Sequence, residues 1–116
     1  MNTFIYIAEK LSINTLLILS SFSVILGDLF AKYWSENTRP LFFGIAILGY
    51  LFSGLFYIPT LLREGLVITS TIWTLISNIG FVVIGLLIFK ESLNTLQIIG
   101  VTLGFISLII LAFSFK

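Results

Sequence analysis

The stretch from Gly65 to Leu93 reads GLVITSTIWTLISNIGFVVIGLLIFKESL and decides the class of fold. Its first 25 residues, Gly65 to Phe89, carry no charged side chain and, at about 1.5 Å per helical residue, can cross the ~30 Å hydrocarbon layer of a bilayer. The first half also carries many hydrogen-bonding side chains: Thr69, Ser70, Thr71, Trp73, Thr74, Ser77 and Asn78. A helix surrounded by lipid has no use for these groups. The stretch therefore predicts a membrane-spanning helix with one face against a neighbouring helix or a solute.

Composition extends this prediction to the whole chain. Of its 116 residues, 59% are hydrophobic and only 9% are charged, which leaves too few polar side chains to cover a soluble domain. Cysteine and histidine are absent, which excludes disulfides, thiolate nucleophiles and histidine-based metal sites. We therefore expect an integral membrane protein without a metal or another cofactor.

Three further apolar runs flank the stretch at 65–89. They cover residues 13–33, 41–62 and 95–115, and short polar loops separate them. Each run has about 20 residues or more and can span a bilayer as a helix, and the short connections make consecutive helices antiparallel neighbours. The expected fold is an all-α membrane protein, a single domain over residues 1–116 with four transmembrane helices and both termini on one side.

The first residues form a separate feature. Residues 4–7 are apolar and aromatic, and Glu9 and Lys10 close the segment. It lacks the basic start and the small-residue cleavage site of a secretory signal. One interpretation of residues 1–12 is an interfacial helix that lies on the membrane, and the other is an early extension of the first span.

The six positive charges divide equally between the two sides of the expected membrane, with Lys10, Arg63 and Lys116 on the side of the termini and Lys32, Arg39 and Lys90 on the other. Lys and Arg in short loops normally mark the cytoplasmic side. Their balance here predicts insertion in both orientations, and two oppositely inserted copies can pack as an antiparallel dimer. The alternatives are a tie by chance, or an orientation fixed by the N-terminal segment.

An enzymatic function is not expected. Nucleophilic pairs of serine or cysteine with histidine are impossible without histidine. Asp28, Glu64 and Glu91 belong to different spans or to opposite ends of the helices, so no carboxylate pair of a hydrolase is predicted. A net charge of +1 with scattered positive residues also argues against a nucleic-acid partner.

The segment from Ile88 to Gly100, IFKESLNTLQIIG, resembles the last loop and the start of the last helix in the drug/metabolite transporter (DMT, EamA-like) superfamily. There, an apolar helix ends in a phenylalanine, a charged Glu-Ser/Pro-Leu turn follows, and an Ile-Gly pair opens the next helix. The chain length, the four spans and the spacing of six residues resemble its smallest branch, the small multidrug resistance family: Gly27, Lys32, Tyr50, Trp73, Leu93 and Gly100. The similarity runs from about Ser20 to the C-terminus.

This resemblance implies an antiparallel dimer of four-helix subunits, in which the first three helices enclose a cavity and the fourth helix forms the dimer interface. Gly100, Gly104 and Ser107 recur at positions i, i+4 and i+7 of the fourth helix and make a stripe of small residues. Such a stripe lets two helices approach closely inside a membrane. The alternative is ordinary packing within one subunit.

Polar and aromatic side chains on the second and third spans are the candidate lining of the cavity, where a substrate binds: Tyr50, Tyr57, Ser70, Trp73, Thr74, Ser77 and Asn78. Ser20 and Ser23 on the first span and Ser53 on the second add to this polar face. Aromatic faces attract desolvated cations by about 2 kcal/mol or more, which suits quaternary ammonium or guanidinium groups. The alternative is that the hydroxyls bond back to the backbone of their own helices.

One carboxylate lies inside a predicted span. In the small multidrug resistance family, a glutamate eight residues before the lysine at the end of helix one binds protons and cationic substrate in mutual exclusion; here Val24 occupies that position. Asp28 lies one turn further along. A carboxylate costs about 2.5–3.5 kcal/mol at the centre of a membrane helix, so Asp28 is predicted to face protein or water and to bind a proton or substrate. The alternative is that Asp28 and Lys32, at i and i+4, neutralise each other near the membrane boundary.

Three functions fit these observations. The first is a proton-coupled secondary transporter that exports a small organic cation or another metabolite. The second is a subunit of a flippase for lipid-linked headgroups, which acts with a paralogous subunit and needs no central glutamate. The third is a non-transporting structural relative that binds another membrane subunit. In each case the resemblance implies a multi-pass protein of the prokaryotic cell (inner) membrane.

Overall fold

The computed structural model describes residues 1–114 of the chain. These residues form five α-helices and two shorter helical turns: α1 (Asn2–Glu9), α2 (Ile13–Glu36), α3 (Pro40–Tyr57), the 3-10 turn η1 (Ile58–Leu62), α4 (Leu66–Val83), the π-helical turn η2 (Ile84–Ile88) and α5 (Thr95–Ser114). No strand occurs among the described residues. Two residues used in the sequence predictions lie outside them, namely Phe115 at the end of the fourth predicted span and Lys116 in the charge balance.

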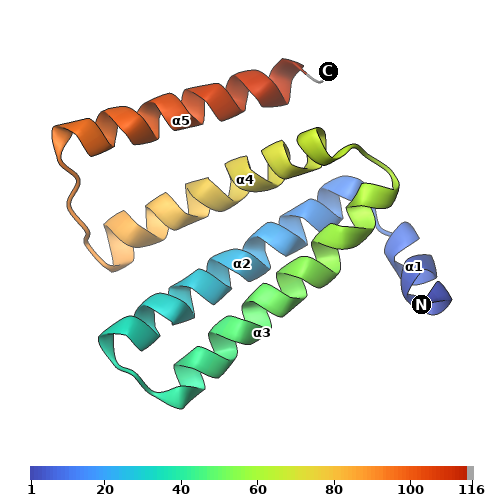
Figure 1. The fold of residues 1–116 in the computed structure, drawn as a ribbon, viewed down its shortest axis with the longest axis horizontal. Helices are drawn as coiled ribbons and strands as arrows, with labels where there is room; N and C mark the ends of the chain where they lie inside the picture. Colours follow the sequence, from blue (N-terminus) through green and yellow to red (C-terminus); the bar gives the residue numbers. More distant parts are fainter. Residues whose placement is uncertain (115–116) are drawn as a thin grey trace.

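Four segments are long and apolar enough to cross a membrane, and they cover Ile13–Glu36, Pro40–Leu62, Leu66–Ile88 and Thr95–Ser114. This finding confirms the predicted all-α class with four transmembrane helices. Figure 1 shows the four segments side by side in one layer, in the order α5, α4, α2, α3. The layer measures 45 × 39 × 16 Å, and the N-terminus and the end of α5 lie toward the same end of it (Figure 1).

Local sequence signals set where the helices begin. Ser12 caps α2, because its hydroxyl accepts a hydrogen bond of 3.1 Å from the backbone amide of Thr15. Pro40 occupies the first turn of α3, where its missing amide hydrogen is not needed. Asn94 and Gln97 form a reciprocal capping box at the start of α5, with hydrogen bonds of 2.8 and 3.0 Å.

The tightest helix pair is α2 with α3, and two glycines permit it. A Cβ atom at Gly49 would lie 2.7 Å from the Cα atom of Gly27 and 2.9 Å from the Ser23 carbonyl oxygen. Both neighbours are backbone atoms and cannot move aside independently. Small residues therefore bring the two backbones into direct contact, as is common for helices in membranes.

The two outer elements are held less firmly. Helix α1 is separate from α2, so residues 1–12 do not simply extend the first span. Ala8 of α1 is buried, and its carbonyl accepts a hydrogen bond of 3.0 Å from Arg63 Nη2. On the opposite side, α5 contacts α4, and none of the residues Thr95–Ser114 is buried. The layer thus has a packed centre, formed by α2, α3 and α4, and an exposed α5.

Candidate functional site

Asp28 meets Tyr50 where α2 and α3 cross. The Tyr50 hydroxyl donates a hydrogen bond of 2.5 Å to Asp28 Oδ1, and the Tyr50 ring lies against Gly27, where a Cβ atom would come within 2.9 Å of ring carbons. Asp28 is half-buried and lies about 5 Å along the axis from the midpoint of α2, at about 1.5 Å per residue. The carboxylate is therefore held within the membrane-spanning part by a donor from a neighbouring helix, as the cost of burying it requires.

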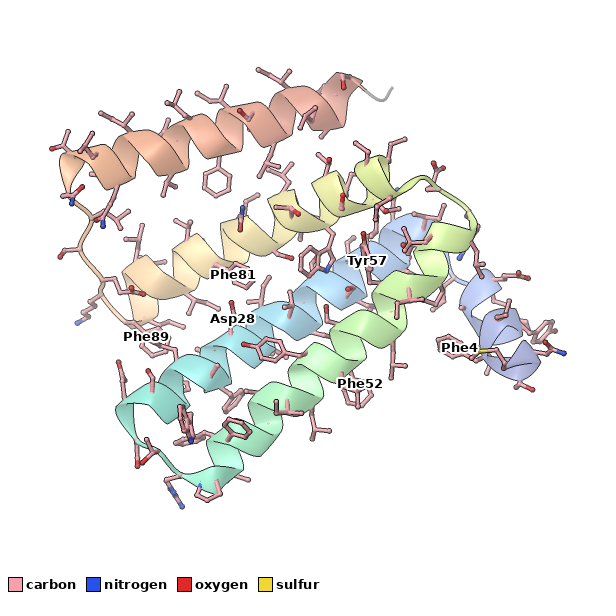
Figure 2. The ribbon with its side chains drawn as sticks, viewed as in Figure 1. Phe4, Asp28, Phe52, Tyr57, Phe81 and Phe89 are labelled. Atoms are coloured by element: carbon pink, nitrogen blue, oxygen red, sulfur yellow. The ribbon has the colours of Figure 1, made fainter. Side chains whose placement is uncertain are left out.

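The same carboxylate opens onto a pocket of about 200 Å³ beside α4. The pocket is lined by Asp28, Lys32, Phe81, Ile84, Gly85, Phe89 and Glu91. Figure 2 shows Asp28 on α2, with Phe81 and Phe89 along the neighbouring α4 segment. The walls are thus partly aromatic, and three charged side chains share the space.

Asp28 does not pair with Lys32 in the part of the chain that the structure describes. The carboxylate accepts the Tyr50 hydroxyl instead, and the Lys32 ammonium lies 5.9 Å from the centre of the Phe89 ring. Lys32 nevertheless lines the same pocket. The geometry thus favours a carboxylate oriented by Tyr50 over a directly neutralised pair.

The structure also brings together two acidic residues that the sequence assigns to different segments. Asp28 belongs to α2 and Glu91 follows η2, as the sequence indicates, yet both line the pocket beside α4. The reason is that the chain turns back after α4, and the backbone amide of Glu91 donates a hydrogen bond of 2.9 Å to the Gly85 carbonyl. This turn returns Glu91 to the end of α4, so sequence reasoning missed it as a pocket residue.

A second polar group links α2, α3 and α4. Ser20 Oγ donates to the Ser53 carbonyl at 2.7 Å and lies 3.0 Å from Ser53 Oγ, and it accepts a hydrogen bond of 2.9 Å from Trp73 Nε1. Ser21 Oγ donates to the Trp73 carbonyl at 3.4 Å. Ser20 and Ser21 are completely buried, and Ser53 is almost so. These hydrogen bonds join three helices directly, so they stabilise the centre of the layer.

Tyr57 and Ser70 lie near this second group but make different contacts. The Tyr57 ring packs at 5.8 Å between centroids against Trp73, and its hydroxyl lies 3.5 Å from Thr69 Oγ1. Ser70 Oγ donates to the Val67 carbonyl of its own helix at 3.3 Å. Ser70 thus follows the back-bonding alternative, whereas Tyr57 and Trp73 form an aromatic pair between helices.

The remaining predicted lining residues lie further along α4. Thr74 is half-buried, and Ser77 is buried with no hydrogen-bond partner for its hydroxyl. Asn78 lines a pocket of about 320 Å³ between α4 and α5, together with Gly100 and Gly104. Within this one subunit the predicted lining residues thus make separate contacts: Tyr50 meets Asp28, Tyr57 and Trp73 belong to the Ser20 group, and Asn78 lies on the α4–α5 side.

The predicted dimer stripe lies on the exposed surface of α5. Gly100, Gly104 and Ser107 are all exposed, and a Cβ atom at Gly100 or Gly104 would meet nothing within 4 Å. The two glycines line an open pocket with Asn78. They therefore make no close helix contact within the subunit.

The pocket beside α4 has the chemistry of a cation or proton site. Its carboxylates can bind a cation or take up a proton, and the rings of Phe81 and Phe89 offer faces that attract organic cations. Among residues 1–114, no group of three or more histidine, cysteine or acidic side chains is arranged to hold a metal ion. The arrangement suits reversible binding of a small charged solute between the ends of α2 and α4.

Comparison with known proteins gives one match and one negative result. The family model described as Small Multidrug Resistance protein matches residues 12–104. No curated protein matches the chain. The match includes α2, α3, α4, the first half of α5 and the pocket beside α4, and it confirms the resemblance inferred from the sequence. The chain belongs to the small multidrug resistance protein family.

Proposed function

We propose that this small multidrug-type membrane transporter moves a small organic cation in exchange for protons, and that Asp28 carries the exchanged charge. The observation that supports the proposal is the Asp28–Tyr50 hydrogen bond at the edge of a pocket with aromatic walls. A half-buried carboxylate held by one donor keeps its remaining lone pairs for a ligand. Substrate and proton compete for those lone pairs, which is how one group couples two fluxes.

The rest of the site has supporting roles. Tyr50 orients the carboxylate through its hydroxyl, and Phe81 and Phe89 supply ring faces for the cation. Tyr57, Trp73 and Ser20 keep α2, α3 and α4 in register through their mutual contacts. Side chains alone thus bind the proton and the cation, without an enzymatic activity or a cofactor.

The test is electrical. Purified protein is reconstituted in liposomes, and guanidinium, quaternary ammonium and polyaromatic cations are perfused at several pH values over wild type, Asp28→Asn and Glu36→Gln. Glu36→Gln is the matched control, because Glu36 is an exposed carboxylate at the far end of the same helix. We expect substrate-dependent currents from wild type and the control and none from Asp28→Asn. Silence from folded wild type would overturn the proposal and favour the flippase or structural alternatives.

We also propose that two copies pair in the prokaryotic inner membrane in opposite orientations and that α5 contributes to their interface. The supporting observation is that α5 buries none of its residues Thr95–Ser114 within one subunit. Because the chain contains no cysteine, a single introduced thiol reports contacts cleanly. Ser107→Cys is expected to form a cross-linked dimer in membranes, whereas Gly44→Cys on α3 is expected to remain monomeric. Equal cross-linking of both variants would contradict a specific α5 interface.

A further inference from the structure

We propose that Glu91 makes the pocket beside α4 selective for cations, an inference that rests on the proposed function. Asp28 and Lys32 both line this pocket, and their formal charges cancel. A site with no net charge has no long-range preference for a cation. Glu91 is the third charged residue of the lining and brings the pocket to a net charge of −1, which a monovalent cation or one proton neutralises.

The backbone holds Glu91 at the pocket through an irregular end of α4. Helix α4 continues into the π-helical turn Ile84–Ile88, where the Phe89 amide donates to the Ile84 carbonyl at 3.2 Å. Lys90 then adopts a left-handed backbone conformation with φ of 52°. Residues other than glycine rarely adopt this conformation. The Glu91 amide returns to the Gly85 carbonyl at 2.9 Å. The conformation at Lys90 and this hydrogen bond turn the chain so that Glu91 lies beside Gly85 of η2.

Gly85 leaves the space that the Glu91 carboxylate occupies. A Cβ atom at position 85 would lie 3.0 Å from Glu91 Oε1 and 3.7 Å from its carboxyl carbon. Any side chain at position 85 would therefore press on the carboxylate. The absence of a side chain there and the backbone conformation at Lys90 together allow the exposed Glu91 side chain to lie at the edge of the pocket.

The three charges share the pocket without direct neutralisation. No ion pair joins Lys32 to Asp28 or to Glu91 in the described chain; the Lys32 ammonium lies 5.9 Å from the Phe89 ring centre, and Asp28 accepts from Tyr50. The net charge of the lining, rather than one contact, therefore sets the attraction for a solute. Affinity for a monovalent cation should follow that net charge as single charges are removed.

The test is a charge series measured by isothermal titration calorimetry in lipid nanodiscs, with guanidinium as the probe and urea as its neutral analogue of similar shape. Glu91→Gln removes one negative charge, and we expect it to weaken guanidinium binding by about tenfold or more. Lys32→Gln in the Glu91→Gln background restores the net charge of −1 and should restore binding. Glu64→Gln is the matched control, because Glu64 lies at the other end of the helices, beside Arg63.

Two outcomes overturn this proposal, and they are distinguishable. If wild type binds guanidinium and Asp28→Asn abolishes binding, but Glu91→Gln binds like wild type, Glu91 has no role in selectivity while the proposed function stands. If wild type binds neither guanidinium nor a quaternary ammonium ion titrated in the same way, the proposed function fails and this inference fails with it. Restoration of binding in the double variant separates a charge effect from damage to the fold, which a second substitution would not repair.

Discussion

The Tyr50 hydroxyl on α3 donates a hydrogen bond of 2.5 Å to the Asp28 carboxylate on α2. This hydrogen bond joins two membrane helices through an acidic side chain in the interior of the α2 span. A hydrogen bond to a charged group contributes about 1.5–3 kcal/mol, which corresponds to at least about a tenfold change in binding. Tyr50→Phe keeps the ring and removes only the donor, so we expect the half-saturating concentration of a transported cation to rise about tenfold in liposome current measurements.

The control for Tyr50 is Tyr33→Phe. Tyr33 follows Lys32 in α2. Its ring packs against Phe30, Phe42 and Phe89. Removing its hydroxyl should leave the half-saturating concentration unchanged. A similar loss in both variants would show that the effect comes from general packing and not from the Asp28 carboxylate.

Ser20 holds the indole of Trp73 by a buried hydrogen bond of 2.9 Å. Ser20→Ala leaves the indole N–H without an acceptor, and such a loss costs about 1–3 kcal/mol. We expect a correspondingly lower free energy of unfolding in mixed detergent micelles, followed by circular dichroism. Ser23→Ala is the matched control on the same helix, because Ser23 Oγ bonds only to the Leu19 carbonyl one turn back; equal destabilisation of both variants would contradict the role of Ser20.

Ser77 is buried, and its hydroxyl has no hydrogen-bond partner. An unsatisfied buried hydroxyl carries a desolvation penalty, so Ser77→Ala is expected to raise the free energy of unfolding by about 1 kcal/mol. Transport should be unchanged, because Ser77 does not line the pocket beside α4. Loss of transport in this variant would instead support the predicted role of Ser77 in substrate binding.

Gly49 permits the contact between α2 and α3. A methyl group at this position would meet backbone atoms at 2.7–2.9 Å, and overpacking of this kind costs about 1–3 kcal/mol. Gly49→Ala should lower the thermal unfolding temperature in detergent. Gly44→Ala lies on the same helix with nothing within 4 Å, and it should be neutral or stabilising because alanine favours helix. The opposite order of stabilities would contradict the close approach at Gly49.

Arg63 fastens α1 to the layer by a hydrogen bond of 3.0 Å to the Ala8 carbonyl. Arg63→Gln shortens the side chain and should release α1, which is seen as faster amide hydrogen exchange over residues 2–9. Exchange in α2 should not change. Arg39→Gln, at the opposite end of the helices, is the control, and unchanged exchange of α1 in Arg63→Gln would show that other contacts hold it.

Some of the site followed from the sequence. A carboxylate inside a membrane helix needs a partner, which is why the sequence predicts a role for Asp28. The structure supplies that partner in Tyr50, which the sequence places on the polar face of the second span. Glu91 could not be selected. Its position depends on the left-handed conformation of Lys90 and on the bond from Glu91 to Gly85, and neither a lysine nor its neighbours mark such a reversal in the sequence.

The class of protein and its four spans follow from the sequence alone. The length of each apolar run and its low charge are local properties, and these properties decide whether a helix is stable in a bilayer. Which polar groups meet is a property of the packed helices. Trp73 forms a hydrogen bond with Ser20, 53 positions earlier, and Asp28 forms one with Tyr50, 22 positions later. Helical periodicity assigns each residue to a face, but the close approach of α2 and α3 at Gly27 and Gly49 and the reversal after α4 set the register that brings those faces together.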